Sequence, residues 1–424
     1  MRVQLAWTML TELLVTISGI LLLKLAASLL GPVGFGEYAL SRRAVGLMYL
    51  PLVMGLGIAA PRYIAIARAG ALENYSESSF ATATLTAGLL PALLVCLLLN
   101  LQPEWSATLL FGTTELSSLV PPATIALAGI TLHSMVYAIY RGRSEMGVAN
   151  TMQLVNLGLI PVGSFLLVQH TAAAVLTATG FGWIVISGIA LMHVLYRERA
   201  DWRGLRSMND HLRLLLRFGL PRVPGEFALV GLFAIPSLIA VRTHGVVAAG
   251  QFSAAMSVLT MASGAFAPVG LVILPRASAQ AATGDVEGLR RLVLRILGGG
   301  ILLAAAGVLV GELVIPSFIE WYFGPAFVPA IPVFRACLIG AIPYVVYILM
   351  RSILDALDVK AVNSRNLIIS LILLTILCLV NSDLMWMSLS LVACLTLLGA
   401  LTLRDTFARL RTPIVTAPPT TAVA

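Results

Sequence analysis

The sequence predicts an all-α polytopic membrane protein in which twelve transmembrane helices form two pseudo-symmetric six-helix lobes around a central cavity. The first observation is the composition: of 424 residues, 59% are hydrophobic and 11% are charged, whereas a soluble domain is about 45–50% apolar and about 25% charged. The second is a series of apolar runs, and the third is an internal repeat. The composition alone excludes an ordinary soluble enzyme and a disordered chain.

The apolar runs are each about as long as a helix that crosses a bilayer, which needs roughly 20 residues. Backbone groups in lipid must be hydrogen-bonded within the segment, so these runs are expected to be helices. A barrel would instead show alternating segments of about ten residues. The expected spans lie at about 5–30, 38–60, 79–100, 119–140, 147–168, 173–196, 219–241, 250–274, 292–314, 329–350, 362–381 and 384–403.

Basic residues are concentrated in every second connection between these spans. If both termini are cytoplasmic, the outer connections contain only Arg242 as a cation, and most other Lys and Arg residues outside the spans lie on the inner side. Cytoplasmic loops of membrane proteins carry this excess of positive charge. The net charge of +8 is therefore explained by basic residues in cytoplasmic connections, and no nucleic-acid partner is expected.

The chain is expected to divide into two lobes joined by a polar linker. The predicted N-terminal lobe is 1–196 and the C-terminal lobe is 219–403. Between them, 197–218 is rich in arginine and then amphipathic, which predicts a cytoplasmic linker with a short helix on the inner membrane surface. The remaining residues, 404–424, are expected to form a cytoplasmic tail.

The two halves of the sequence are related by an offset of 214 residues, which aligns Gly36 with Gly250. The same offset aligns Glu12 with Glu226, two charged residues inside spans. Because each half has an even number of spans, the repeat is parallel, and two such bundles form a cleft that rocking exposes to either side. Further pairs at this offset are Pro61-Arg62 with Pro275-Arg276, Tyr38 with Phe252, and Gly70 with Gly284.

Four glycine-rich stretches occur in order at helix boundaries: LGPVGFGEY at 30–38, RFGLP at 217–221, AGQFSAA at 249–255 and FGPAFVPAIPV at 323–333. Together they resemble the polysaccharide-transporter family, the O-antigen-type lipid-linked oligosaccharide flippases of the multidrug/oligosaccharidyl-lipid/polysaccharide (MOP) superfamily. The resemblance implies a MATE-like pair of lobes around a central cavity. It also implies transfer of an undecaprenyl-pyrophosphate-linked glycan across the bacterial inner membrane by alternating access, for O-antigen, exopolysaccharide or capsule synthesis. The implied partners are membrane lipids, a polysaccharide polymerase and a chain-length regulator.

Four cations lie in the outer halves of spans: Lys24, Arg42, Arg43 and Arg335. A charge in hydrocarbon costs at least about 2.5–3.5 kcal/mol, so each is a candidate functional residue. We hypothesise that they line the cavity and attract a pyrophosphate or an acidic sugar, since a guanidinium donates two hydrogen bonds at once to phosphate. The alternative is that their long side chains reach the headgroups.

Glu12 and Glu226 lie in the inner halves of spans 1 and 7, and we hypothesise that they couple transport to a proton or sodium gradient. The alternative for Glu226 is a structural bond to Arg222, one turn away. Arg62 and Arg276 end spans 2 and 8, and they are candidates for an inner gate. The simpler interpretation is that they only stop the helix and set the topology.

Other functional classes are less consistent with the sequence. A major-facilitator carrier would have a glycine-rich motif with Asp between spans 2 and 3, which is missing here. A multidrug antiporter of the same superfamily is the nearer alternative, although a cationic outer half disfavours cationic drugs. A membrane polymerase or glycosyltransferase would need long outer loops with catalytic motifs. We therefore expect no catalytic residues, no metal site and no cofactor beyond a coupling ion.

Overall fold

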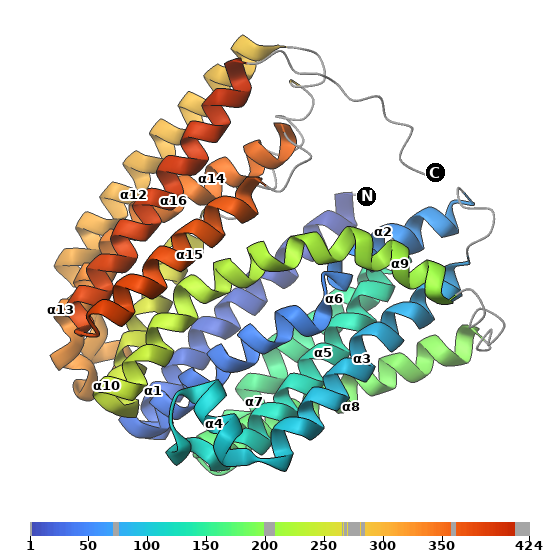
Figure 1. Ribbon diagram of the computed structural model, residues 1–424, viewed down its shortest axis with the longest axis horizontal. Helices are drawn as coiled ribbons and strands as arrows, with labels where there is room; N and C mark the ends of the chain where they lie inside the picture. Colours follow the sequence, from blue (N-terminus) through green and yellow to red (C-terminus); the bar gives the residue numbers. More distant parts are fainter. Residues whose placement is uncertain are drawn as a thin grey trace. The chain divides into compact units, whose positions relative to one another are not determined.

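The computed structural model describes residues 2–70, 76–198, 208–264, 266, 269, 280, 285–357 and 362–411. Within this part of the chain, every regular element is a helix (Figure 1). Ten of the helical runs there are long and apolar enough to cross a membrane. The two longest, Trp7–Arg68 and Asn209–Gly264, each cover most of two of the spans expected from the sequence. The protein is therefore an all-α polytopic membrane protein, as predicted.

The described chain forms two compact units. Unit 1 contains Met1–Ser253 and Glu320–Phe327, and unit 2 contains Ala254–Ile319 and Val328–Ala424. Unit 1 therefore includes most of the helix that follows the polar linker. The lobe boundaries expected at 196 and 219 remain a prediction, and each unit is described below by itself.

Unit 1 is built around one buried helix, α5, which packs against α8, α3, α2 and α1. Small residues allow this close packing: a Cβ atom at Gly129 would lie 2.6 Å from the Gly180 carbonyl oxygen of α8. Close approach at glycines is how helices associate in a bilayer, where apolar burial gives little driving force. The elements of unit 1 are α1 (Arg2–Val53), α2 (Leu56–Arg68), α3 (Glu77–Leu101), α4 (Pro103–Phe111), η1 (Thr114–Leu119), α5 (Val120–Gly142), α6 (Met146–Leu154), η2 (Val155–Leu159), α7 (Ile160–Leu167), α8 (Ala172–Glu198), α9 (Met208–Gly219), η4 (Leu220–Arg222) and the first part of α10 (Val223–Gly264).

The first two expected spans are joined more tightly than the sequence suggested. The sequence predicts a connection at 31–37, but in α1 these residues are helical except for Gly31, which has φ 66° and ψ −177°. A positive φ costs glycine little. Pro32 follows directly, at the first position of the next helical segment, where its missing N–H is harmless. One residue is therefore enough to turn the chain.

The amphipathic helix α9 lies against unit 1 through its apolar face. Leu215 is fully buried among residues of α2, α3 and α5, and His211 is buried with its ring 4.7 Å from that of Phe80. The apolar face, expected on the inner membrane surface, is therefore covered by protein. At the end of α9, a Cβ atom on Gly219 would lie 2.5 Å from the Met54 carbonyl oxygen, so glycine is required for this approach.

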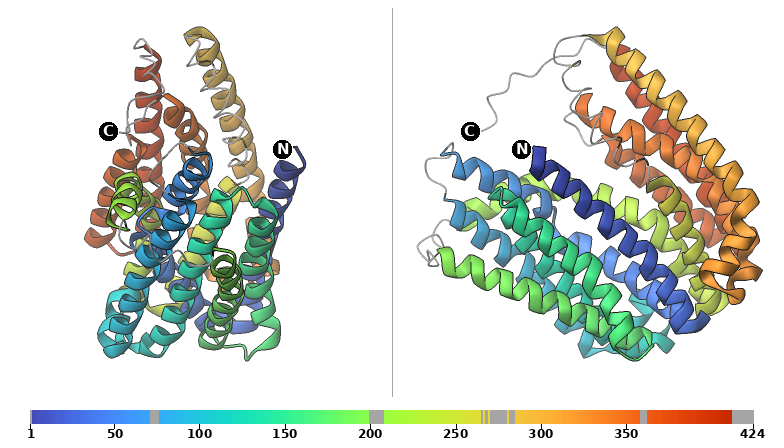
Figure 2. Two further views of the ribbon diagram at one scale, coloured as in Figure 1. Left: turned by 90° about the vertical axis from the view of Figure 1, so that its right-hand side faces the viewer. Right: turned by 180° about the vertical axis from the view of Figure 1, so that it is seen from behind.

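Unit 2 contains most of α12 (Val286–Phe323), followed by η5 (Pro325–Ala330), α13 (Ile331–Ile339), α14 (Ala341–Leu357), α15 (Val362–Val380) and α16 (Leu384–Arg411). α16 packs against α13, α14 and α15, and Figure 2 shows these helices side by side. An ionic contact links two of them: Asp405 of α16 accepts a hydrogen bond from Arg365 of α15 at 2.6 Å. Leu289, Val345 and Ile353 are among the fully buried residues of the core.

Candidate functional site

The internal repeat is visible in the backbone. The non-helical residue of α10 is Gly245, with φ 80° and ψ 178°, and it lies 214 positions after Gly31. The two kinks have nearly the same dihedral angles. The offset that aligned Gly36 with Gly250 in the sequence therefore also aligns the two bends of the backbone.

The aligned glycines themselves meet. A Cβ atom on Gly250 would lie 2.6 Å from the Cα atom of Gly36, and one on Gly36 would lie 2.8 Å from Cγ1 of Val246. A residue that touches its own repeat counterpart lies next to a pseudo-two-fold axis. Only glycine at both positions permits this approach of α1 and α10 in unit 1.

Arg43 joins the same two helices. Its guanidinium donates to the Phe233 carbonyl, to the Ser253 hydroxyl at 3.1 Å and to the Ser253 carbonyl at 2.9 Å. Successive residues of a helix point about 100° apart, so its neighbour Arg42 faces another direction. Arg42 is exposed, with its guanidinium 5.7 Å from the ring centre of Tyr38. The two adjacent arginines therefore differ: Arg43 holds helices together and Arg42 has an accessible guanidinium.

Lys24 lies against the end of α12 that belongs to unit 1. Its Nζ atom is 3.6 Å from the ring centre of Trp321, a cation–π contact. The next residue, Tyr322, donates to the Ile20 carbonyl one turn before Lys24. Trp321 is 68% exposed and is typical of the aromatic residues found at membrane interfaces. The ammonium of Lys24 thus points toward the C-terminal end of α12.

Arg335 lies in unit 2, on α13. Its Nε atom is 3.5 Å from a carboxylate oxygen of Glu312 on α12, and its side chain is 48% exposed. This pair explains how one cation is accommodated in a membrane-spanning segment, because a charge with an opposite partner costs less to desolvate. A role for Arg335 in substrate binding stays a prediction.

In unit 1, Glu12 has an amide partner. Its carboxylate accepts a hydrogen bond at 2.9 Å from Nε2 of Gln153 on α6. One turn earlier on both helices, Asn150 donates to the hydroxyl of Thr8 at 2.9 Å. Glu12 is exposed in this structure. Its hydrogen bond places an acidic group beside a row of amides.

The apolar runs of the sequence do not predict this row of amides. Asn150, Gln153 and Asn156 follow one another at helical spacing on α6 and the π-helical turn η2, and all three are buried. Their side-chain oxygens have no hydrogen-bond partner in the described structure. The amides are spaced three residues apart inside an apolar span. This spacing predicts that they share one helix face, because side chains three apart lie on the same side of a helix.

A second polar contact continues the row. Nδ2 of Asn156 lies 2.8 Å from Nδ1 of His133 on α5 and donates to the Ser187 hydroxyl of α8 at 3.0 Å. π-helical turns inside α-helices occur frequently at functional sites. The three amides and His133 are therefore buried polar groups inside unit 1, and the exposed Glu12 contacts one of them, Gln153.

The remaining predicted residues are placed as follows. Glu226 lies half-buried in the first turn of α10. Arg62 of α2 is exposed, and its guanidinium is 4.6 Å from the ring centre of Phe218. Arg222 stacks on the same ring at 4.0 Å and donates to the Phe218 carbonyl. Arg276 lies outside the described residues, so the inner-gate hypothesis remains a prediction.

Comparisons with known proteins give the family and the fold. The family model described as "polysaccharide biosynthesis protein" matches residues 4–280, and the chain belongs to this family. A comparison with curated protein sequences finds no match.

Several solved transporters share the fold. An inward-facing multidrug resistance MATE family transporter of the MOP superfamily has a TM-score of 0.74 at 15% identity, covering 92% of this chain and 94% of that chain. A point mutant of the Vibrio cholerae MATE transporter VcmN has a TM-score of 0.65 at 16% identity, with 96% of each chain covered. A MOP superfamily transporter from Pyrococcus furiosus has a TM-score of 0.61 at 15% identity, covering 96% of this chain and 94% of that chain. The protein is thus a multi-pass membrane protein with a MOP-superfamily transporter fold.

Proposed function

We propose that this protein is a flippase, not an enzyme. It moves an undecaprenyl-pyrophosphate-linked oligosaccharide from the cytoplasmic to the periplasmic leaflet of the bacterial inner membrane, for O-antigen, exopolysaccharide or capsule synthesis. The observation that carries the proposal is the polysaccharide-biosynthesis family match over residues 4–280 in a chain with a transporter fold. Both termini lie in the cytoplasm, and a polymerase and a chain-length regulator act on the product.

The cations of α1 support an anionic substrate. Arg42 is exposed and Lys24 keeps its ammonium on an aromatic face, and neither has a carboxylate partner among the residues that the structure describes. A membrane-spanning charge without an acidic partner is expensive, and such residues commonly mark a substrate path. A pyrophosphate offers both residues oxygen acceptors. In this proposal Arg42 and Lys24 bind the substrate, whereas Arg43 positions α10.

Glu12 is proposed to couple transport to a proton or sodium gradient. A carboxylate inside a span can take up a proton or bind a cation, and both belong to known transport pathways. Gln153 already donates to Glu12, and the same helix face carries Asn150 and Asn156, whose buried side-chain oxygens have no hydrogen-bond partner among the described residues. Glu226, its repeat counterpart, is the second candidate.

Depletion of the protein in cells tests the proposal. We expect lipid-linked glycan to accumulate on the inner leaflet, and the wild-type gene to reverse this. Lys24→Ala and Arg42→Ala should fail to complement, while Arg290→Ala, which changes a 60% exposed residue outside the outer halves of the spans, should complement. If both Lys24→Ala and Arg42→Ala complement fully, these cations do not bind the substrate. If glycan transfer stays normal after depletion, the proposal that this protein is a flippase is contradicted.

A second candidate function is supported by the fold, because two of the similar structures are described as multidrug resistance or MATE transporters. A multidrug antiporter should confer efflux of a cationic dye that depends on an ion gradient. We expect no such efflux from this protein, since Lys24 and Arg42 repel cations. Dye efflux together with unchanged glycan transfer would favour the antiporter.

A further inference from the structure

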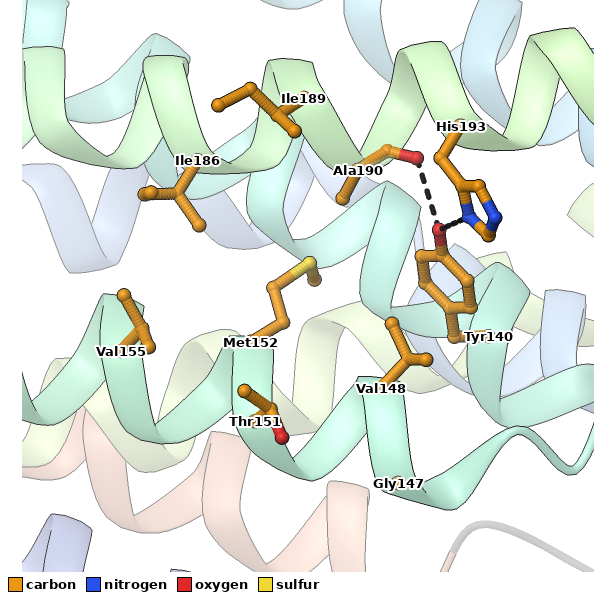
Figure 3. A pocket seen from close by; sticks show the side chains of 10 residues that line it. All are labelled: Tyr140, Gly147, Val148, Thr151, Met152, Val155, Ile186, Ile189, Ala190 and His193. Carbon is orange, nitrogen blue, oxygen red and sulfur yellow. Dashed lines mark hydrogen bonds between the residues drawn. The ribbon is translucent and has the colours of Figure 1, made fainter.

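The groove between α5, the α6–η2 segment and α8 (Figure 3) has no Lys, Arg, Asp or Glu side chain in its lining. The hydrogen-bonding groups at its polar end serve each other, because the Tyr140 hydroxyl donates to the Ala190 carbonyl at 3.1 Å and lies 2.9 Å from Nδ1 of His193. This groove therefore offers an ionic ligand no counter-charge. The surface of unit 1 that does so lies where α2, α9 and η4 meet.

One aromatic ring holds two arginines at this junction. The ring centre of Phe218, near the end of α9, lies 4.6 Å from the guanidinium carbon of Arg62 on α2 and 4.0 Å from that of Arg222 in η4. The ring of Tyr63 packs edge-on against Phe218, with the ring centres 6.0 Å apart. Arg222 also donates to the Phe218 carbonyl. These contacts position both guanidinium groups on one platform.

The two arginines have no carboxylate partner in the described part of the chain. No ion pair there includes Arg62 or Arg222, and Glu226, one turn after Arg222, forms none with it. Because both guanidinium carbons lie so close to one ring centre, the two charges are nearer to each other than about 10 Å, the screening length at 0.1 M salt. They therefore repel each other, and an anion bound by both would relieve that repulsion.

The donors of this pair are largely available. A guanidinium carries five N–H donors, and one that lies over an aromatic ring presents its planar fork to oxygen acceptors at its edge. Arg222 uses Nη1 for the Phe218 carbonyl, and Arg62, which is exposed, makes no hydrogen bond to any residue that the structure describes. Two such forks match the oxygens of a phosphate group.

The pair lies at the ends of membrane-spanning helices. Arg222 directly precedes α10, and Arg62 lies six residues before the end of α2, about 9 Å along the axis. The ends of spans lie near the lipid headgroups. Apolar side chains adjoin the arginines: Ile58, one turn before Arg62, is 51% exposed, and Leu220 is 50% exposed. A ligand here would thus meet two cations beside an exposed apolar surface.

We propose that Arg62 and Arg222, held on the ring of Phe218, bind the phosphate group of a membrane lipid. The phosphate oxygens accept hydrogen bonds from both guanidinium groups, and the lipid hydrocarbon lies along Ile58 and Leu220. A phospholipid headgroup and the pyrophosphate of a polyprenyl carrier offer the same chemistry. The inference therefore does not depend on the proposed flippase function.

The test is protection of arginines from phenylglyoxal, a reagent for guanidinium groups, with the full chain in neutral detergent. Short-chain phosphatidylglycerol at about ten times its Kd should slow modification of Arg62 and Arg222 about tenfold, as followed by peptide mass spectrometry. Arg213 is the internal control, because it is exposed on α9 and points about 140° away from Phe218; its modification should not change. Equal protection of all three arginines, or protection of none, overturns the proposal.

Two other ligands at the same concentration identify the source of the phosphate. Stronger protection by a short-chain prenyl pyrophosphate assigns the site to a polyprenyl carrier, and stronger protection by phosphatidylglycerol assigns it to a phospholipid. Equal protection by inorganic pyrophosphate contradicts binding of a lipid.

The substitution Phe218→Leu tests the platform, because it keeps both arginines and removes the ring. It should weaken binding of phosphatidylglycerol about threefold through the loss of two cation–π contacts. An unchanged Kd in this variant would contradict the role of the ring. The protection experiment on the wild-type protein needs no variant, so a folding defect in Phe218→Leu leaves the site testable.

Discussion

The contact between Gly36 and Gly250 makes a strong prediction for the substitution Gly250→Ala. The added methyl would lie 2.6 Å from the Cα atom of Gly36, and ordinary contacts begin at 3.4 Å. The helices must therefore separate by about 0.8 Å, and since the opposing atom is backbone, no side-chain rotation can relieve the overlap. Overpacking of this kind destabilises proteins by about 1–3 kcal/mol, so the free energy of unfolding in detergent should fall by that amount.

Gly19→Ala is the matched control, because a Cβ atom at this helical position meets nothing within 4 Å. It should raise stability slightly, by about 0.5–1 kcal/mol, as alanine restricts the unfolded chain. The double variant Gly36→Ala/Gly250→Ala should cost less than the sum of the single changes, because both separate the same pair of helices. If Gly250→Ala unfolds with the same free energy as Gly19→Ala, the reasoning about this contact is refuted.

Three further predictions concern charged residues. Arg43→Gln should lower the free energy of unfolding by about 3 kcal/mol, because charge-assisted hydrogen bonds are lost. Arg42→Gln should change it by less than about 0.5 kcal/mol. Equal losses in the two variants would contradict the different roles of the two arginines. Glu12→Gln should leave thermal stability unchanged but remove the dependence of transport on an ion gradient, and retained dependence would exclude Glu12 from coupling. Asp405→Ala should cost about 1–3 kcal/mol, because its carboxylate also accepts from the buried Asn366 amide at 2.9 Å, which would lose its partner; no loss in a chemical unfolding curve would contradict this link between α15 and α16.

The helices and the repeat could be predicted from the sequence because both depend on local patterns. Apolar runs predict the spans. The alignment of Gly36 with Gly250 predicts the offset between the two halves, and the backbone bends at Gly31 and Gly245 are separated by the same offset. The predicted connection at 31–37 is longer than the turn in the structure, where only Gly31 is non-helical. A glycine-rich stretch suggests a loop, but a single residue at positive φ was sufficient here.

The roles of individual charges could be predicted only in part. The 100° rotation between successive residues indicated that Arg42 and Arg43 face different directions, but only the fold shows that Arg43 meets Phe233 and Ser253. Those contacts join residues 190 and 210 positions apart, and no local pattern contains that information. The buried amides near Glu12 were missed for another reason, since uncharged polar residues barely lower the hydropathy of a span.

The central claim is that this protein carries a lipid-linked glycan across the bilayer, and transfer in proteoliposomes tests it most directly. Purified protein is reconstituted with an undecaprenyl-pyrophosphate-linked oligosaccharide in one leaflet, and its appearance in the other is followed with an impermeant glycan-modifying enzyme. We predict transfer with wild-type protein and with Arg290→Ala, and strongly reduced transfer with Lys24→Ala and Arg42→Ala. Transfer no faster than in protein-free vesicles, from protein that is folded and correctly inserted, would contradict the account.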